Sequence, residues 1–221
     1  MTIITIALIT WQLINSNGRN STSGADFYNI YVIRHAEGKY QPIHKCDPPQ
    51  HPKLNAEIGM CGDWGDNRCG GDYLIEPGLD RADCIANLNF EGMALLIAQN
   101  PLTCHHEGVV KREYQTVLPL SMKKGMPINI DYSRNDEVFL AQDLTLSSRR
   151  YELCSNSQTV QSVVISWDHS NIPTLLMELG CDHEMCHTKM KKYDFESIYK
   201  LTMSCIDGSF LYVEQSAQGC S

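Results

Sequence analysis

The chain has 221 residues, enough for one domain of ordinary size, and its 43% hydrophobic and 20% charged residues are typical of a globular protein. It carries 18 Lys and Arg against 26 Asp and Glu, a formal net charge of −8. No basic run exceeds two residues, so we expect no nucleic-acid partner. No apolar run reaches the roughly 20 residues of a membrane-spanning helix, so we expect no integral membrane segment.

The N-terminus has the pattern of a secretory signal peptide over residues 1–18. This stretch has no charged side chain, residues 3–14 are mostly apolar, and Ser16-Asn17-Gly18 offers small residues for cleavage. A buried first strand is the alternative interpretation. We therefore expect a protein that is secreted or retained in the lumen of the secretory pathway, with one mature domain over residues 26–221.

Predicted strands and helices alternate along the rest of the chain. A strand at 27–33 is followed by a long loop at 38–73, which is rich in Gly, Pro, Asp and Cys. After the loop we predict helices at 79–88, 111–124 and 171–179, and strands at 94–98, 126–130, 162–167, 195–199 and 210–214. This alternation predicts an α/β fold with three layers, a mostly parallel central sheet with helices on both faces.

Cysteine usage agrees with an oxidising compartment. All ten cysteines lie beyond residue 18, and Asn20-Ser21-Thr22 is a possible glycosylation acceptor. We expect several disulfides, whose connectivity the sequence leaves open. Cys84, on the apolar face of a predicted helix, could instead be a buried free thiol.

Two histidines follow predicted strands directly. His35 comes after the first strand, and His169 comes just after the strand at 162–167. Sites in α/β sheets form at the carboxyl ends of strands, so we expect the two imidazoles to meet. Arg34 and Arg112 add guanidinium groups that bind phosphate oxygens bidentately. The pattern predicts a pocket for a phosphate monoester, in which one imidazole attacks phosphorus.

Four motifs resemble those of the histidine phosphatase superfamily, also called phosphoglycerate mutase-like. YVIRHAE (31–37) resembles the family's Arg-His-Gly motif, and LIEPGLDRA (74–82) resembles its Leu-Thr-x-x-Gly-x-x-Arg-Ala segment. REYQT (112–116) resembles its Arg-x-x-Gln/Glu-Thr motif. SWDH (166–169) stands where the family has its second catalytic histidine. The likeness covers roughly residues 27 to 215. It is greatest to a fungal branch that has Arg-x-Tyr-x-Thr-Val-Leu-Pro-Leu, Trp-Glu-His and a tail like YDFESIY.

The resemblance implies a metal-independent phosphate-monoester hydrolase that needs no cofactor and acts on a small phosphorylated substrate. His35 would form a phosphohistidine, while Arg34, Arg112 and His169 would hold the phosphate and stabilise the transition state. A mutase is disfavoured, because an exported protein meets no glycolytic intermediates and the chain has no extra basic cluster to retain a bisphosphate.

The proton donor to the leaving alcohol is harder to place from the resemblance. It should follow the strand at 126–130, where Asp136 and Glu137 are the candidates. Asp168 is a third candidate, and it could instead orient the imidazole of His169.

Departures from the family pattern leave a second function open. Ala36 replaces the glycine after the first histidine, and Val109-Val110-Lys111 stands where a serine commonly precedes the second arginine. The loop at 38–73 would lie beside the nucleophile and influence substrate choice. The alternative is a catalytically degenerate secreted member that binds a phosphorylated or anionic ligand or a partner protein.

A metal-binding extracellular module is a third interpretation. Cys181, His183, Cys186 and His187 have the residue types of metal ligands within seven positions. Their spacing matches no common zinc pattern, and in an oxidised chain we expect such thiols to form disulfides.

Overall fold

The structure is a computed structural model that describes residues 25–43, 69–101, 104–105, 108–155 and 159–220. The signal peptide predicted over 1–18 lies outside these residues. None of the helices in the described ranges is both long enough and apolar enough to cross a membrane.

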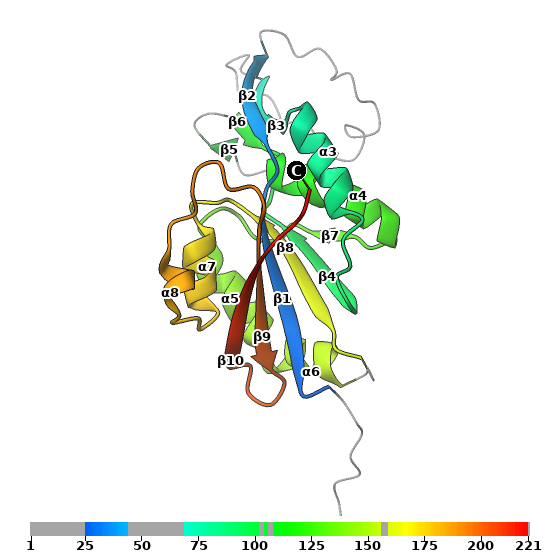
Figure 1. Ribbon diagram of the computed structural model, residues 1–221, viewed down its shortest axis with the longest axis vertical. Coiled ribbons are helices and arrows are strands. Elements are labelled where there is room, and N and C mark those ends of the chain that lie inside the picture. Colours follow the sequence, from blue (N-terminus) through cyan, green and yellow to red (C-terminus); the bar gives the residue numbers. More distant parts are fainter. Residues whose placement is uncertain (1–24, 44–68, 102–103, 106–107, 156–158, 221) are drawn as a thin grey trace, which may run out of the picture.

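A six-stranded sheet forms the centre of the fold (Figure 1). Its order is β10 (Phe210–Ala217), β9 (Ser197–Ser204), β1 (Phe27–Arg34), β8 (Ser162–Trp167), β4 (Met93–Ala98) and β7 (Ile128–Asn129). Strands β1, β8, β4 and β7 pair in parallel, while β9 pairs antiparallel with both of its neighbours. The prediction of a mostly parallel central sheet is confirmed.

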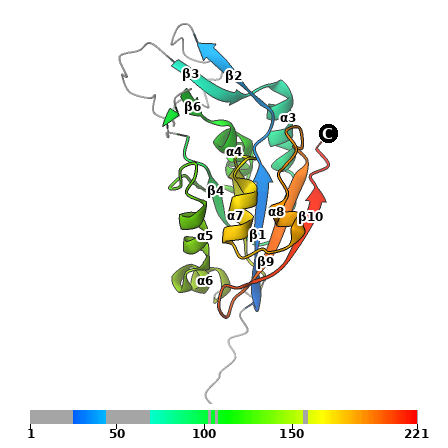
Figure 2. The ribbon, with the colours of Figure 1, turned by 90° about the vertical axis from the view of Figure 1, so that its left-hand side faces the viewer.

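Helices cover both faces of this sheet, as predicted (Figure 2). One face packs against α5 (Glu137–Thr145), α6 (Ser147–Cys154), α7 (Ile172–Glu178) and α8 (Glu184–His187). The other face packs against α3 (Glu76–Ile85) and α4 (Arg112–Lys124). The three layers follow from two separate apolar clusters, one on each side of the strands.

The alternation of side chains along β1 explains the two clusters. Successive residues of a strand point to opposite faces of its sheet. Tyr28, Ile30 and Val32 are fully buried in the cluster that contains α5 and α7, whereas Ile33 is buried in the cluster that contains Val117 of α4. A strand with both faces covered therefore reads in sequence as the nearly continuous apolar run FYNIYVI.

The structure differs from the sequence prediction in several elements. The segment predicted as one loop begins with β2 (Gly38–Ile43) and ends with β3 (Cys69–Leu74), which pair antiparallel; residues 44–68 lie outside the described residues. These strands join β6 (Gly108–Val110) and β5 (Cys104–His105) in a second sheet. Helices α5 and α6 were not predicted, and β9 begins two residues later and runs five residues further than the strand predicted at 195–199.

Three disulfides join cysteines of the described residues. They link Cys84 to Cys220, Cys154 to Cys205, and Cys181 to Cys186. Cys84 is therefore not a free thiol. The Cys181–Cys186 bond also uses both thiols of the segment considered for a metal, which leaves that segment without a thiolate ligand.

Candidate active site

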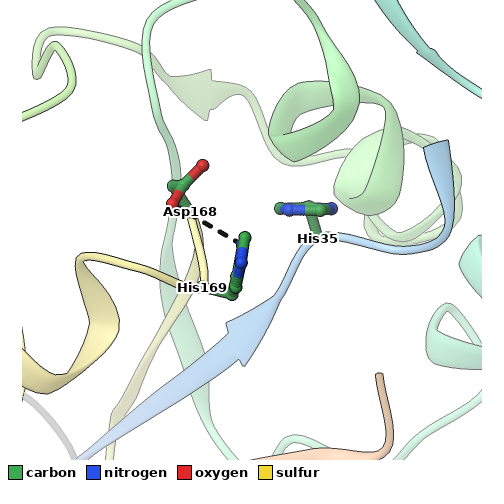
Figure 3. A group of neighbouring side chains, drawn as sticks. All are labelled: His35, Asp168 and His169. Atoms are coloured by element: carbon green, nitrogen blue, oxygen red, sulfur yellow. Dashed lines mark ion pairs between the residues drawn. The ribbon is translucent and has the colours of Figure 1, made fainter. Parts of the chain in front are cut away.

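The carboxyl ends of β1 and β8 bring two segments together that are far apart in the sequence. Arg34 is paired with Trp167 in the parallel register, and the backbone N–H of His35 donates to the carbonyl of Trp167 at 3.3 Å. His35 and the neighbouring pair Asp168 and His169 therefore leave their strands at the same edge of the sheet (Figure 3).

Two imidazoles and one carboxylate form the centre of the site. The ring centroids of His35 and His169 lie 5.8 Å apart, with the rings inclined at 80° to each other. The Nδ1 atom of His169 lies 3.7 Å from an oxygen of Asp168. One polar atom from each of the three side chains can be chosen so that all three atoms lie within 4.8 Å of one another, and Figure 3 shows the three side chains close together.

A backbone contact fixes the tautomer of His35. Its Nδ1 atom lies 2.8 Å from the carbonyl oxygen of Ala36, and a carbonyl can only accept a hydrogen bond. Nδ1 therefore carries the proton in the neutral ring, and Nε2 carries the lone pair. The backbone at Ala36 is itself held by Thr116 of α4, whose hydroxyl oxygen accepts a hydrogen bond from the N–H of Ala36 at 2.8 Å.

Both histidines are held in the neutral form near pH 7. Burial lowers the pKa of His35 well below its usual value, and the neighbouring charges of Arg112 and Arg34 lower it further. Burial and Arg34 also lower the pKa of His169, against an opposing effect of Asp168. The lone pair on Nε2 of His35 is thus available over a wide range of pH.

Arg34 places a buried cation next to these rings. The residue is 3% exposed. Burial, together with the charge of Arg112, lowers its pKa to about 10, so the guanidinium remains charged at neutral pH. Its Nη1 atom donates to the carbonyl oxygens of Lys191 and Asp194, while its buried Nε has no hydrogen-bond partner among the described residues.

Arg112 is the first residue of α4, and its side chain passes close to Gly38 at the start of β2. A Cβ atom at position 38 would lie 2.0 Å from Cδ of Arg112 and 2.6 Å from its Cγ. The absence of a side chain at Gly38 therefore leaves the space that the Arg112 stem occupies. The positive charge of Arg112 acts on both His35 and Arg34 and lowers the pKa of each.

The motif at 74–82 supports the chain just after the nucleophile candidate. Arg81 of α3 donates from Nε and Nη2 to the carboxylate of Glu37, each at 2.8 Å, and from Nη1 to Glu196. A Cβ atom at Gly78 would lie 2.0 Å from the carbonyl oxygen of Glu37. The glycine and arginine of this motif thus allow α3 to approach and bind the segment that follows His35.

Asp168 is an ionised group in this setting. Its burial acts to raise the pKa, but hydrogen bonds from the hydroxyl and the N–H of Ser170, together with the charge of Arg134, outweigh burial and lower the pKa overall. A carboxylate that stays ionised is a poor proton donor, and it attracts the N–H group of a neighbouring imidazole. This environment suits the second role considered for Asp168, the orientation of His169.

The two carboxylates predicted as proton donors both make hydrogen bonds within the protein. An oxygen of Asp136 accepts a hydrogen bond from the N–H of Ser133 at 2.7 Å. Glu137, which is 4% exposed, accepts a hydrogen bond from the indole Nε1 of Trp167 at 2.8 Å. Of the carboxylates considered, Asp168 is the one placed in the cluster with His35 and His169.

Glu113 is a residue at the site that sequence reasoning did not identify. Its side chain is fully buried, and its Oε1 lies 4.0 Å from Nε2 of His35. An acidic residue in the first turn of a helix is ordinarily explained by the helix dipole, which favours negative charge there. The signal available in the sequence was its position directly after Arg112.

The ligand types in the cluster also allow a cation to be considered. Two imidazoles and a carboxylate with polar atoms within 4.8 Å suit a divalent transition metal as well as an anion. The positive charges of the buried Arg34 and the half-buried Arg112 oppose cation binding, since like charges repel more strongly away from water. A chelator therefore belongs in any test of activity.

Comparison with known proteins gives a likeness in fold. No protein-family model matches the sequence, and no curated protein sequence matches it. Among solved structures, mycobacterial hydrolase 2 superposes with a TM-score of 0.50 at 14% identity, covering 86% of this chain and 90% of that one. At this identity the likeness concerns the fold alone.

Two further structures give slightly lower scores. The protein histidine phosphatase SixA complexed with tungstate has a TM-score of 0.49 at 15% identity, covering 86% of this chain and 97% of that one. Phosphoglycerate mutase from Plasmodium falciparum has a TM-score of 0.48 at 11% identity, covering 89% and 92% of the two chains.

Proposed function

We propose that this protein is a secreted, metal-independent phosphate-monoester hydrolase of the histidine phosphatase superfamily, which works through a phosphohistidine on His35. The motif order in the sequence supports membership of the superfamily, and of its fungal branch in particular. The described disulfides support an oxidising compartment, because such bonds persist there and are rare in the cytosol.

One observation carries the proposal. Nε2 of His35 is a buried nitrogen that bears a lone pair, because Nδ1 is held by the carbonyl of Ala36, and Nε2 has no hydrogen-bond partner among the described residues. Nε of Arg34 and Nδ1 of His169 are likewise buried and without such a partner. Buried polar atoms of this kind are rare in folded proteins. The oxygens of a tetrahedral anion would accept hydrogen bonds from Nε of Arg34 and from a protonated Nδ1 of His169, while the lone pair of Nε2 of His35 stays available to attack phosphorus.

The chemistry follows from these positions. The lone pair on Nε2 of His35 attacks phosphorus, and the bond from phosphorus to the ester oxygen breaks with its electron pair moving to the leaving alcohol, which takes up a proton. Arg34, Arg112 and His169 hold the equatorial oxygens as charge develops on them. Water then attacks phosphorus and releases a proton to the solvent, which balances the proton taken up from the solvent by the alcohol, while the P–N bond breaks and its electron pair returns to Nε2.

Replacement of the nucleophile tests the proposal. We expect His35→Asn to lower turnover of p-nitrophenyl phosphate by about a thousandfold or more, and to abolish the acid-labile phosphoprotein that rapid quenching of the wild-type protein yields. The exposed His187→Asn variant is the matched control and should keep both signals. EDTA should leave the wild-type rate unchanged. Full turnover by the His35→Asn variant would reject His35 as the nucleophile.

Glu113 favours a second candidate function. A fully buried carboxyl group 4.0 Å from Nε2 of His35 would, when ionised, repel an incoming phosphate dianion. Such a group suits a degenerate member that binds an anionic ligand or a partner protein without hydrolysis. The same rapid-quench experiment separates the two functions, because a protein that only binds forms no phosphohistidine.

A further inference from the structure

The segment between α8 and β9 makes three contacts with Arg34. The carbonyl oxygens of Lys191 and Asp194 accept hydrogen bonds from Nη1 of Arg34 at 3.0 and 3.2 Å. The ring of Phe195 lies under the guanidinium, with its centroid 3.9 Å from Cζ of Arg34. Residues about 160 positions away in the sequence thus hold the arginine that directly precedes His35.

This segment is itself well ordered by hydrogen bonds. The side chain of Asp194 accepts from the N–H of Ser197 at 3.1 Å and from its hydroxyl at 2.8 Å, while the N–H of Asp194 donates to the carbonyl of Lys191. Both carbonyls that bind Arg34 therefore belong to a turn with its own internal bonds. A turn held in this way can impose an orientation on the side chain that it contacts.

The contacts occupy one edge and one face of the guanidinium. Nη1 is used by the carbonyls and the π face by Phe195, while the buried Nε remains without a hydrogen-bond partner among the described residues. Phe195 also lies against the nucleophile candidate, since its ring centroid is 6.3 Å from that of His35 in an edge-to-face arrangement. One aromatic ring thus touches both groups on which the proposed reaction depends.

We propose that Phe195 is a positioning residue, which uses a cation–π contact to fix Arg34 in the orientation that receives the phosphoryl oxygens. This inference rests on the proposed function, and it assigns a role in phosphate binding to a residue that does not itself touch the phosphate. A guanidinium held in place before the substrate arrives loses little freedom when it binds, so both anion affinity and transition-state stabilisation gain.

The first test compares two aromatic residues of the same segment. We expect Phe195→Leu to weaken the binding of inorganic phosphate about tenfold, and to lower kcat/KM for p-nitrophenyl phosphate by a similar factor, because a cation–π contact away from water is lost. Tyr193, which is 80% exposed, provides the matched control. Tyr193→Leu should change neither quantity by more than about twofold. Unchanged phosphate affinity in Phe195→Leu would overturn the proposal.

A second test separates the cation–π contact from the shape of the side chain. Fluorinated phenylalanines at position 195 keep the ring and withdraw electron density from its face, so phosphate affinity should fall in steps from one to three fluorine atoms. Phe195→Tyr should stay within about threefold of the wild type. Equal affinity across the fluorinated series would mean that the ring acts by packing alone, which would also overturn the proposal.

The proposed function can fail separately from this inference. Phosphate affinity is measured at equilibrium and needs no turnover, so a stepwise loss across the fluorinated series would support the role of Phe195 even in a protein that forms no phosphohistidine. Conversely, if the protein is an active phosphatase whose affinity for inorganic phosphate does not change with fluorination of Phe195, the proposed function stands and the positioning role of Phe195 is rejected.

Discussion

Glu137 accepts a hydrogen bond from the indole N–H of Trp167 at 2.8 Å, and both side chains are buried. Trp167 is the last residue of β8, directly before Asp168 and His169. The bond therefore joins the start of α5 to the strand end that carries half of the candidate site. A buried N–H group without an acceptor would destabilise the fold, so this contact gives Glu137 a structural role.

Replacement of Glu137 should affect stability more than chemistry. We expect Glu137→Ala to lower the free energy of unfolding by about 1–3 kcal/mol, because the indole loses its acceptor, and Glu137→Gln to cost less, because an amide oxygen still accepts. Urea unfolding measures both. If Glu137 were instead the proton donor, Glu137→Gln would slow alkyl phosphates, whose leaving group needs a proton, far more than p-nitrophenyl phosphate. Asp136→Asn is the natural comparison for that ratio.

Replacement of the carboxyl group of Glu113 by an amide should strengthen anion binding at any pH at which that group is ionised. Glu113→Gln keeps the shape of the side chain and removes an ionisable group whose Oε1 lies 4.0 Å from Nε2 of His35. Like charges a few ångströms apart in a partly desolvated site repel by several kcal/mol, so if Glu113 is ionised near pH 7 we expect the Gln variant to bind phosphate about tenfold more tightly or better. Isothermal titration calorimetry with phosphate or tungstate is a direct measurement. Weaker phosphate binding by Glu113→Gln would show that the carboxyl group of Glu113 contributes to anion binding. The exposed Glu91→Gln variant is the control and should bind phosphate like the wild type.

Stability should fall as the pH is lowered from about 6.5 towards 5. The pKa of His35 is lowered in the folded protein, so below its ordinary value the unfolded chain takes up a proton that the folded protein refuses. The stabilisation is fully present above about pH 6.5 and is lost on acidification, by up to roughly 1.4 kcal/mol per pH unit for a fully buried group. His169 acts in the same direction and, being partly exposed, contributes less.

Urea unfolding between pH 7 and pH 5 measures this slope, in a range above the ordinary titration of carboxyl groups. His35→Asn should reduce the slope, because its side chain does not titrate. The exposed His187→Asn should keep the wild-type slope. A slope that is the same in all three proteins would contradict a buried, neutral His35.

The disulfides should contribute unequally to stability. Cys84 and Cys220 are separated by 136 positions, whereas Cys181 and Cys186 are separated by 5. Chain-entropy estimates for loops of these lengths are about 5 and about 2 kcal/mol. We expect the double variant Cys84→Ser, Cys220→Ser to lose clearly more unfolding free energy than Cys181→Ser, Cys186→Ser. Equal losses would show that strain or residual structure outweighs loop length.

The central sheet could be predicted from the sequence because its strands are covered on both faces. The apolar runs FYNIYVI and SVVISW coincide with β1 and β8 to within a residue, and the polar residues that follow each run placed the two histidines at one sheet edge. The antiparallel pair β2 and β3 has no comparable apolar run in its sequence. Gly, Pro and Asp are unfavourable in strands, and here pairing between the strands overrides their local preference.

The rest of the site depends on contacts that sequence patterns do not encode. Glu113 reads as an ordinary acidic residue at a helix start, and its burial follows only from the way α4 packs beside His35. Phe195 reads as part of a strand that in fact begins at Ser197. The partner of Cys84 lies at the far end of the chain, and ten cysteines allow too many pairings for spacing to decide.

The crossing of Gly38 and the Arg112 stem links two positions that are far apart in the sequence. Because even a methyl group at position 38 would overlap the arginine, the identities of these two residues should vary together across related chains. A homologue with a bulky residue at 38 must have a shorter residue at 112 or an arginine whose stem takes another path, and a shorter, uncharged residue would remove this cation. This pair of positions can therefore sort uncharacterised relatives into those that retain the full charge complement and those that have lost it.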